Sequence, residues 1–342
     1  MTLVFAYVRT HAVDNNTFLD AFSFFTGPDP THGYVKFVSR DEALSSSLLS
    51  LSEGTVRMAA ETTDTSSPRR SIRVQSKALF SGAIFIIDLN HIPTGCGTWP
   101  AFWSVGPNWP SAGEIDILEG VHRSTHDQTT LHTSTGCGMA HSSTLFTGRW
   151  GTNKVGKPST DCFVGDPKQY ANAGCAIIDD DAASFGAPFN ARGGGVVATV
   201  WDRRGIRTYR WARGAVPSAL AARKPPREAD WGLPYARFDF GPGCDAGHFH
   251  SHQIVFDLTL CGDWAGGTFA SQCADVAKGA SCEAFVSRGA NMMEAYWDVN
   301  YVDVWENAST AEQPPQREPV ATVGPAGHFF HGTTDRGHYV TK

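Results

Sequence analysis

The chain has 342 residues, and 28 Lys and Arg against 34 Asp and Glu give it a net charge of −6. Its basic residues form only short pairs, such as Arg69-Arg70 and Arg203-Arg204, which argues against a nucleic-acid partner. No apolar stretch is long enough to cross a membrane as a helix, so we expect no membrane partner. A hydrophobic content of 41%, with abundant Gly, Trp and Phe, is typical of a turn-rich all-β protein that has a substantial core.

The first part of the chain predicts few elements. Residues 1–16 have no clear pattern, and we expect a poorly defined segment there. Met1–Val8 is apolar but short, lacks a basic region and precedes Arg9, so it is a poor signal peptide. Residues 70–76 alternate as in a half-exposed strand, and the continuous apolar run 83–89 predicts a strand that is covered on both faces.

The most informative stretch is 113–120, where three acids lie within six residues, interleaved with branched apolar side chains. This alternation predicts a β-strand, in which residues two apart share a face. Glu114 and Asp116 would then lie together, and Glu119 would point the opposite way. A β-bulge with one extra residue at Leu118 would return Glu119 to the same face.

A row of acids on one strand face suits a particular chemistry. Like charges repel and burial raises their pKa values, so the row is costly as pure structure. Glycoside hydrolysis needs two carboxyl groups, and a retaining enzyme holds them roughly 5–5.5 Å apart. The Cα atoms of Glu114 and Glu119 would be about 13 Å apart at ~3.3 Å per residue, so both side chains would lean inward over Asp116. Little room would remain for a water between them, which predicts retention of anomeric configuration.

Tryptophans flank the acidic strand. Trp99, Trp103 and Trp109 all lie just upstream of it, where they could stack on sugar rings. The alternative for each is core packing, and the alternative for the acids is an ordinary surface strand.

Further strands are predicted downstream. Residues 129–133 alternate and form a candidate neighbour of the acidic strand, on which His132 could face the acids. Residues 134–192 are polar and glycine-rich and are expected to be disulfide-stapled loops. The remaining predicted elements are a hairpin (196–201 and 206–211), an alternating strand (253–260) that is followed by Trp264 as a rim aromatic, and a last strand region (296–305).

Eight cysteines indicate a disulfide framework, because their number is even and no CxxC pair is present. They are Cys96, Cys137, Cys162, Cys175, Cys244, Cys261, Cys273 and Cys282. Sequence does not choose among the possible pairings. Paired cysteines require an oxidising compartment, so we expect an extracellular protein even though no clear signal peptide is present.

Two other stretches carry weaker signals. His248, His250 and His252 would share one face of a strand, but no carboxylate or cysteine stands near them in a ligand pattern, so we assign no metal site. Residues 307–342 are rich in Pro, Gln and Gly without periodicity, and we expect a disordered tail.

Several separated motifs, taken together, resemble a known family. Glu114 to Glu119 is similar to the E-x-D-x-x-E motif of glycoside hydrolase family 16, and the flanking motifs resemble the secreted fungal laminarinase-like endo-1,3(4)-β-glucanases. Those motifs are 95–101, 109–110, 131–133, 230–232 and 261–266, together with all eight cysteines. The resemblance covers residues 17–306, which we expect to be the catalytic domain.

The resemblance implies a fold and a set of roles. The fold would be all-β, a concanavalin A-like β-jelly-roll sandwich of two antiparallel sheets with an open cleft on the concave face. Glu114 would be the nucleophile, Glu119 the acid/base, and Asp116 would tune their protonation. The sugar subsites would be lined by Trp99, Trp103, Trp109, His132 and Trp264. We expect a monomeric enzyme that acts on β-glucan.

The resemblance also sets limits on the prediction. No cofactor is implied, although calcium stabilises some members of the family, and Asp298 would be a candidate ligand. The family usually has Asn where this chain has His122, which is expected to alter a subsite. A transglycosylase on cell-wall β-glucan and a non-catalytic β-glucan-binding protein are the alternatives. Relatives of the binding kind lack the glutamates that this chain keeps.

Overall fold

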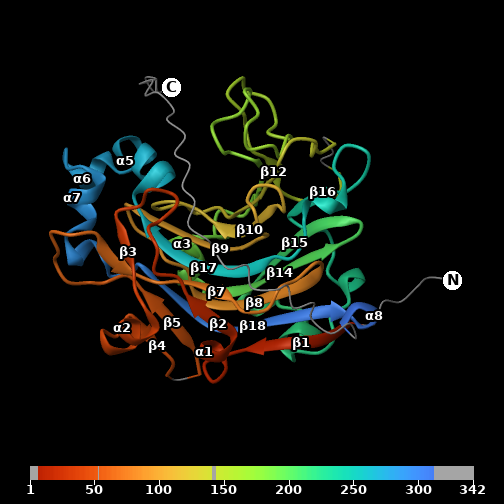
Figure 1. The fold of residues 1–342 in the computed structure, drawn as a ribbon, viewed down its shortest axis with the longest axis horizontal. Helices are drawn as coiled ribbons and strands as arrows, with labels where there is room; N and C mark the ends of the chain where they lie inside the picture. Colours follow the sequence, from red (N-terminus) through yellow and green to blue (C-terminus); the bar gives the residue numbers. More distant parts are fainter. Residues whose placement is uncertain (1–6, 53, 141–143, 312–342) are drawn as a thin grey trace, which may run out of the picture.

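The computed structural model describes residues 7–311 except for 53 and 141–143. Two large antiparallel sheets pack face to face (Figure 1). The first, here called the back sheet, contains β16 (Ala236–Asp239), β15 (Gly205–Ala212), β14 (Gly195–Asp202), β8 (Ala83–His91), β18 (Tyr296–Asn307), β5 (Val56–Ala59) and β4 (Leu49–Ser50) in that order, with β1 (Tyr7–Val13) also paired to β18.

The second sheet, here called the front sheet, carries the acidic strand. Its order is β12 (Arg149–Trp150), β13 (Cys175–Ile178), β11 (Gln128–His132), β10 (Glu114–Glu119), β9 (Thr98–Val105), β17 (Gln253–Leu260), β7 (Arg73–Ser76) and β2 (Phe22–Phe24). A small parallel pair joins β3 (Val35–Phe37) to β6 (Arg69–Ser71). The all-β sandwich predicted from the sequence is confirmed.

The helices are short. The α-helices are α1 (Phe18–Ala21), α2 (Arg40–Ser45), α3 (Gly186–Ala191), α4 (Ser218–Ala221), α5 (Gly267–Gln272), α6 (Ala274–Ala277), α7 (Cys282–Val286) and α8 (Ala308–Ala311). The other helical turns are η1 (Arg213–Ala215), η2 (Glu228–Asp230), η3 (Ala246–His248), the π-helical η4 (Gly262–Gly266) and η5 (Gly289–Met292). The loops around β12 and the helices α5 to α7 stand on opposite sides of β10 (Figure 1). No helix among the described residues is long and apolar enough to span a membrane.

Strand β8 explains why its sequence is a continuous apolar run. Phe85, Ile87 and Leu89 enter the main core between the sheets, whereas Ile84 and Ile86 pack in a second cluster on the other side of the strand. Both faces are therefore covered, as predicted. The strands predicted at 253–260 and 296–305, and the hairpin of β14 and β15, are also confirmed.

Three sequence expectations are wrong in part. Residues 1–16 are expected to be poorly defined, but Tyr7–Val13 form β1, which pairs with β18 along its length. Residues 134–192 are expected to be loops, but Cys175–Ile178 form β13 at the side of β11. In these two cases a partner strand distant in sequence provides the pairing that local pattern does not reveal. The tail predicted to be disordered begins at residue 307, but Asn307 ends β18 and Ala308–Ala311 form α8; the rest of the tail, from 312 onward, lies outside the described residues.

All eight cysteines are paired, which confirms the predicted disulfide framework. The bonds are Cys96–Cys273, Cys137–Cys244, Cys162–Cys175 and Cys261–Cys282. Cys96–Cys273 and Cys261–Cys282 link the segment that contains α5, α6 and α7 with the start of β9 and the end of β17, next to the acidic strand.

We predict that the Cys96→Ser/Cys273→Ser double variant loses about 2–5 kcal/mol of stability, as small disulfide-bonded domains typically do when a native bond is removed. Thermal unfolding should show a lower Tm, and peptide mapping of the unreduced wild type should recover the four linked pairs. Recovery of unmodified cysteine peptides from the majority of the purified protein would contradict the pairing.

Candidate active site

A β-bulge in β10 places the three acids on one face. Along the partner strand β9, Trp103 lies opposite Asp116 and Phe102 lies opposite Leu118, so Ile117 has no partner. The bulge predicted from the sequence is therefore present, but its extra residue is Ile117 and not Leu118. Because two consecutive side chains now point inward, Glu119 returns to the face of Asp116.

The burial of β10 follows from this geometry. Ile115, Ile117 and Leu118 are all fully buried in the core between the sheets. Glu114 and Glu119, which lie on the other face, are only partly buried. The acids therefore face the side of the front sheet that is turned away from the core.

Hydrogen bonds from both neighbouring strands hold the Glu119 carboxylate. Trp99 on β9 donates from Nε1 to Oε1 at 2.9 Å, and Gln128 on β11 donates from Nε2 to Oε2 at 3.4 Å. Ala101 lies opposite Glu119 and leaves space above the strand for its side chain. One rotamer is thereby favoured for a group that would have to reach a glycosidic oxygen.

Glu114 has a different environment. Its carboxyl group is hydrogen-bonded to Asp116 and also receives a hydrogen bond from Trp109. His132 lies opposite Glu114 on β11, and its Nε2 is 3.0 Å from Asp116 Oδ2. Asp116 therefore lies between the two glutamates, in contact with a basic side chain.

The three carboxyl groups hold protons more tightly than isolated ones. Burial and the charge of Asp116 raise the pKa of Glu114 to about 8. Burial and the charge of Glu119 hold the pKa of Asp116 well above its usual value. Burial raises the pKa of Glu119 as well, although the hydrogen bonds from Trp99 and Gln128 oppose that shift. At neutral pH the cluster thus retains protons that could be donated to a substrate.

Asp116 and Glu119 interact through their charges, so these two groups titrate as a pair. Burial favours the protonated form of Glu114, whereas His132 and the Trp109 donor favour its ionised form. One site can therefore contain both an ionised and a protonated carboxyl group, which is the requirement for glycoside hydrolysis by two acids.

Aromatic side chains surround the acids. Trp264, on η4, meets Trp99 edge to face with ring centroids 5.7 Å apart. Trp103 is covered by the Arg73 guanidinium at 5.1 Å, and its Nε1 is buried without a protein partner. Trp109 is 46% exposed. The residues expected to line subsites thus gather around β10, while their role in binding stays a prediction.

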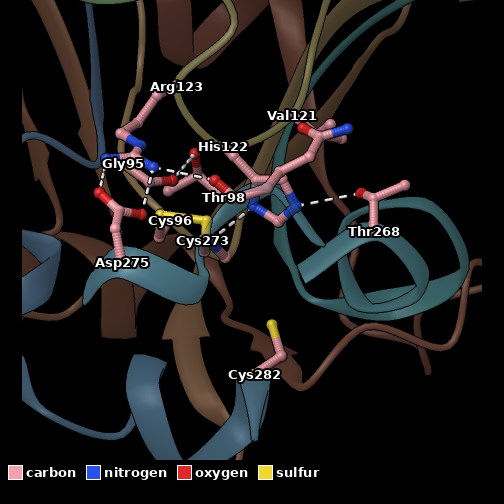
Figure 2. Close-up of a disulfide and its surroundings, with 12 residues drawn as sticks. Gly95, Cys96, Thr98, Val121, His122, Arg123, Thr268, Cys273, Asp275 and Cys282 are labelled. Atoms are coloured by element: carbon pink, nitrogen blue, oxygen red, sulfur yellow. Dashed lines mark hydrogen bonds and ion pairs between the residues drawn. A yellow bond between two sulfur atoms is a disulfide. The ribbon is translucent and has the colours of Figure 1, made fainter. Parts of the chain in front are cut away.

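His122, which is expected to alter a subsite, is held by hydrogen bonds within the protein, and its effect on a subsite stays a prediction. The residue is 2% exposed. Its Nδ1 accepts a hydrogen bond from the Gly97 amide at 2.9 Å, and its Nε2 lies 3.1 Å from Thr268 Oγ1 (Figure 2). Because Thr268 donates its own proton to the Trp264 carbonyl, the His122 Nε2 must donate, which fixes the neutral tautomer.

This tautomer connects the end of β10 to the aromatic rim. Burial and the nearby Arg123 lower the pKa of His122 to about 4, so the ring stays neutral above mildly acidic pH. Arg123 reaches Asp275 on α6 through two hydrogen bonds of 2.7 and 2.8 Å (Figure 2). The Cys96–Cys273 bond joins the stretch before β9 to the same helical segment.

Sequence reasoning missed several polar residues next to the acids. Gln128 falls just before the predicted strand 129–133, although it is the first residue of β11. Asp257 on β17 lies opposite Ala101, close enough for its charge to interact with that of Glu119. Burial raises the pKa of Asp257 to about 7 against the opposing charge of Arg73. The sequence shows only that Asp257 is an acid on the polar face of strand 253–260. Its place near Glu119 follows from the pairing of β17 with β9, which the sequence does not predict.

The potential metal ligands among the described residues do not form an evident separate site. Glu114, Asp116 and His132 approach one another within 4.8 Å, but these are the candidate catalytic groups. Cys137, Cys244 and His248 also converge, yet both cysteines are consumed by their disulfide bond.

The three histidines at 248–252 do not share a strand face. His248 ends η3, and its two ring nitrogens lie near the Asp245 and Thr135 carbonyls. His252 is buried and bonded to Ser104 and the Ala112 carbonyl.

A surface cavity of about 500 Å³ lies beside the acids. Gln128, which binds Glu119, is one of its lining residues, and Arg123, His126 and Arg149 line it as well. The walls of this cavity are mostly polar and include Gln128 next to Glu119, which suits hydroxyl-rich ligands.

Comparison with known proteins agrees with this geometry. Residues 22–305 match the family model described as "XgeA-like, catalytic GH16 domain". The chain belongs to glycoside hydrolase family 16. A probable glycosidase of Schizosaccharomyces pombe is 41% identical over 85% of this chain and 67% of its own length. A probable endo-1,3(4)-beta-glucanase of Aspergillus flavus is 36% identical over 93% of this chain, which spans only 47% of that relative.

Solved structures of family 16 share the jelly-roll fold. Laminarinase 16A from Phanerochaete chrysosporium, solved with 6-O-glucosyl-laminaritriose, has a TM-score of 0.79 at 32% identity and covers 88% of this chain and 100% of its own. An elongating family 16 β-1,3-glucosyltransferase has a TM-score of 0.78 at 34% identity with the same coverage. The predicted family and fold are thus confirmed.

We predict that Glu114→Gln stabilises the protein, and more so at pH 8 than at pH 5. The folded-state pKa of Glu114 is raised, so its contribution to stability is complete below about pH 4.5 and is lost as the pH rises toward 8. Glutamine has the same shape and no charge to bury. Thermal unfolding should show a Tm difference from wild type that grows between the two pH values.

The control is Glu283→Gln, which changes an exposed glutamate on α7. Its Tm difference from wild type should be the same at both pH values. An equal offset at both pH values for Glu114→Gln would contradict the raised pKa.

Proposed function

We propose that this chain is a retaining endo-acting glycoside hydrolase that cleaves β-1,3-glucans, mixed β-1,3-1,4-glucans, or both. The observation that carries the proposal is the bulged strand that aligns Glu114, Asp116 and Glu119 on one face, beneath a group of tryptophans. Relatives named as endo-1,3(4)-beta-glucanases and a laminarinase support the same substrate class.

In the first step Glu119 acts as the acid. Its protonated carboxyl group donates to the glycosidic oxygen while the ionised Glu114 attacks the anomeric carbon from the opposite face of the sugar. The bond to the leaving sugar breaks, and an ester joins Glu114 to the remaining sugar. Asp116 holds the proton that Glu114 must lack, and the contact with His132 stabilises Asp116 when it becomes negative.

In the second step Glu119, now ionised, removes a proton from water. The water attacks the anomeric carbon and releases Glu114, so two inversions give net retention. Trp99 and Gln128 keep donating to the Glu119 carboxylate, which stabilises its charge between the steps. Every proton movement is thus assigned to a residue of the bulged strand.

A transglycosylase is the second candidate, because one of the similar structures is titled an elongating β-1,3-glucosyltransferase. In that reaction a sugar hydroxyl replaces water in the second step, and the same residues serve both reactions. A non-catalytic β-glucan-binding protein is a weaker alternative, since the chain keeps both glutamates.

The remaining proposals concern the whole protein. We keep 17–306 as the catalytic domain, with β1 added at its N-terminal side. Four disulfides support an extracellular location. A monomeric state stays a prediction. The reaction proposed above uses carboxyl groups alone.

Calcium at Asp298 also stays a prediction. Its Oδ1 is buried without a partner, which favours a ligand there, yet no group of three acidic, histidine or cysteine ligand atoms forms around it among the described residues. Thermal unfolding with calcium and with a chelator would test it.

The experiment that tests the proposed function is product analysis on a panel of β-glucans. We expect oligosaccharides from laminarin or mixed-linkage glucan, and proton NMR of the earliest products should show the β-anomer. Early α-anomer would contradict the double displacement. Products longer than the substrate, formed with an added acceptor sugar, would favour the transglycosylase.

We predict distinct defects for the two glutamates. Glu114→Ala should abolish turnover of every substrate, because no nucleophile remains to form the ester. Glu119→Ala should lower hydrolysis of β-glucan about 10²–10⁴-fold while sparing ester formation from a dinitrophenyl oligosaccharide, whose leaving group needs no proton. Added azide should then give a β-glycosyl azide with Glu119→Ala and an α-azide with Glu114→Ala.

Glu283→Ala is the control on the surface and should behave as wild type. Azide products of the reversed configurations would mean that the two roles are exchanged. Full activity of both variants would remove β10 from the mechanism.

A further inference from the structure

The paired ladder between β10 and β11 stops in the middle of the acidic strand. Glu114 pairs with His132, Ile115 with Leu131, and Asp116 with Thr130, and the pairing ends there. Continued without the bulge, this register would bring Glu119 opposite Asp127, just before β11 begins. The bulge at Ile117 thus leaves the backbone of residues 117–119 without strand partners on the β11 side.

Buried side chains occupy the gap. The Glu119 amide donates to Asp127 Oδ1 at 3.2 Å. Tyr235 places its hydroxyl 2.7 Å from Asp127 Oδ2 and 3.3 Å from the Ile117 carbonyl. Asp127 thus accepts from the amide of Glu119, and the Tyr235 hydroxyl, which has one proton for two acceptors, lies between Asp127 and the carbonyl of the extra residue.

The plug, as we call Asp127, Tyr235 and Thr129, is deeply buried. Asp127 and Thr129 are 0% exposed and Tyr235 is 4% exposed. The Thr129 hydroxyl lies 2.7 Å from that of Tyr235. Tyr235 directly precedes β16 of the back sheet, so it reaches across the sandwich to the rear of β10.

Asp127 is itself anchored. Its amide donates to Ser184 Oγ at 2.8 Å, and its carbonyl accepts from the Asp179 amide at 2.9 Å. The next residue, Gln128, is on the front face and donates to the Glu119 carboxylate. Asp127 therefore holds the backbone of Glu119 from the core side, and Gln128 holds the side chain of Glu119 from the front face.

We infer that Asp127 and Tyr235 are positioning residues for the acid/base of the proposed reaction, because they hold the bulge that turns Glu119 onto the substrate face. Neither side chain reaches the front face, so neither contacts substrate. This inference rests on the proposed function. It goes beyond it by assigning the geometry of the acid/base to groups on the core side of the sheet.

A leaving-group comparison distinguishes positioning from general stability. If the plug places Glu119, then Asp127→Ala should impair substrates that need proton donation more than those that do not. We expect kcat/KM to fall roughly 10–100-fold on a laminari-oligosaccharide, the loss typical of a misplaced catalytic group. On the dinitrophenyl glycoside of the same oligosaccharide, measured as the release of dinitrophenol in the first turnover, the loss should be at most a few-fold.

Two milder variants keep the test decisive where Asp127→Ala folds poorly. Asp127→Asn keeps an oxygen for the Glu119 amide and should retain most of the activity on both substrates. Tyr235→Phe removes only the hydroxyl group and should change the ratio of the two kcat/KM values in the same direction as Asp127→Ala. The matched control is Tyr209→Phe on β15 of the back sheet, which removes a buried hydroxyl that binds Glu228 of η2 and should leave the ratio unchanged.

An unchanged ratio of the two kcat/KM values in both Asp127→Ala and Tyr235→Phe, which means equal losses on the two substrates, would overturn the inference. Failure of wild type to cleave any β-glucan would instead refute the proposed function. The two failures are therefore distinguishable.

Discussion

The bulge in β10 is the constraint on which the site depends. An uninterrupted strand would bury Glu119 in the core and leave Glu114 and Asp116 without a second glutamate beside them. One extra residue, Ile117, changes the face of everything that follows it. The irregularity disrupts a ladder in a central strand, where unpaired backbone groups cost about 1–3 kcal/mol each if left unsatisfied. Asp127 and Tyr235 offset that cost with side-chain partners.

Burial then gives the carboxyl groups their chemistry. Three acids on an exposed strand would all be ionised at neutral pH and would repel one another weakly in water. Partly enclosed by tryptophans, they hold protons instead, and burial leads the causes for all three raised pKa values. The folded state is less stable at high pH for this reason, and the proposed reaction uses the protons that this burial retains.

Much of this could be predicted from sequence because the signals are local. The alternation around Glu114 predicts the acidic strand, and the spacing from Asp116 to Glu119 predicts a bulge within it. The continuous apolar run 83–89 predicts a strand that is buried on both faces. The bulge was misplaced by one residue because Ile117 and Leu118 are equally apolar and either could be the extra residue. The disulfide pairing, the pairing of β1 with β18 and the contact of Tyr235 with the bulge join segments distant in the chain. No local pattern encodes those contacts.

The aromatic rim depends on a different set of contacts from those that hold the acids. Trp264 lies at the start of a segment, η4 to α7, whose own core is small and includes Phe269, Val286 and two disulfides. His122 fastens this segment to the end of β10, and its neutral tautomer requires both of its partners, the Gly97 amide and Thr268. Gly97, which binds His122, is two residues from Trp99, which donates to the Glu119 carboxylate and contacts Trp264. His122 therefore supports both the donor to Glu119 and the aromatic rim. Residue 122 lies three positions beyond Glu119, and its two hydrogen bonds join the stretch that carries Trp99 to the segment that carries Trp264.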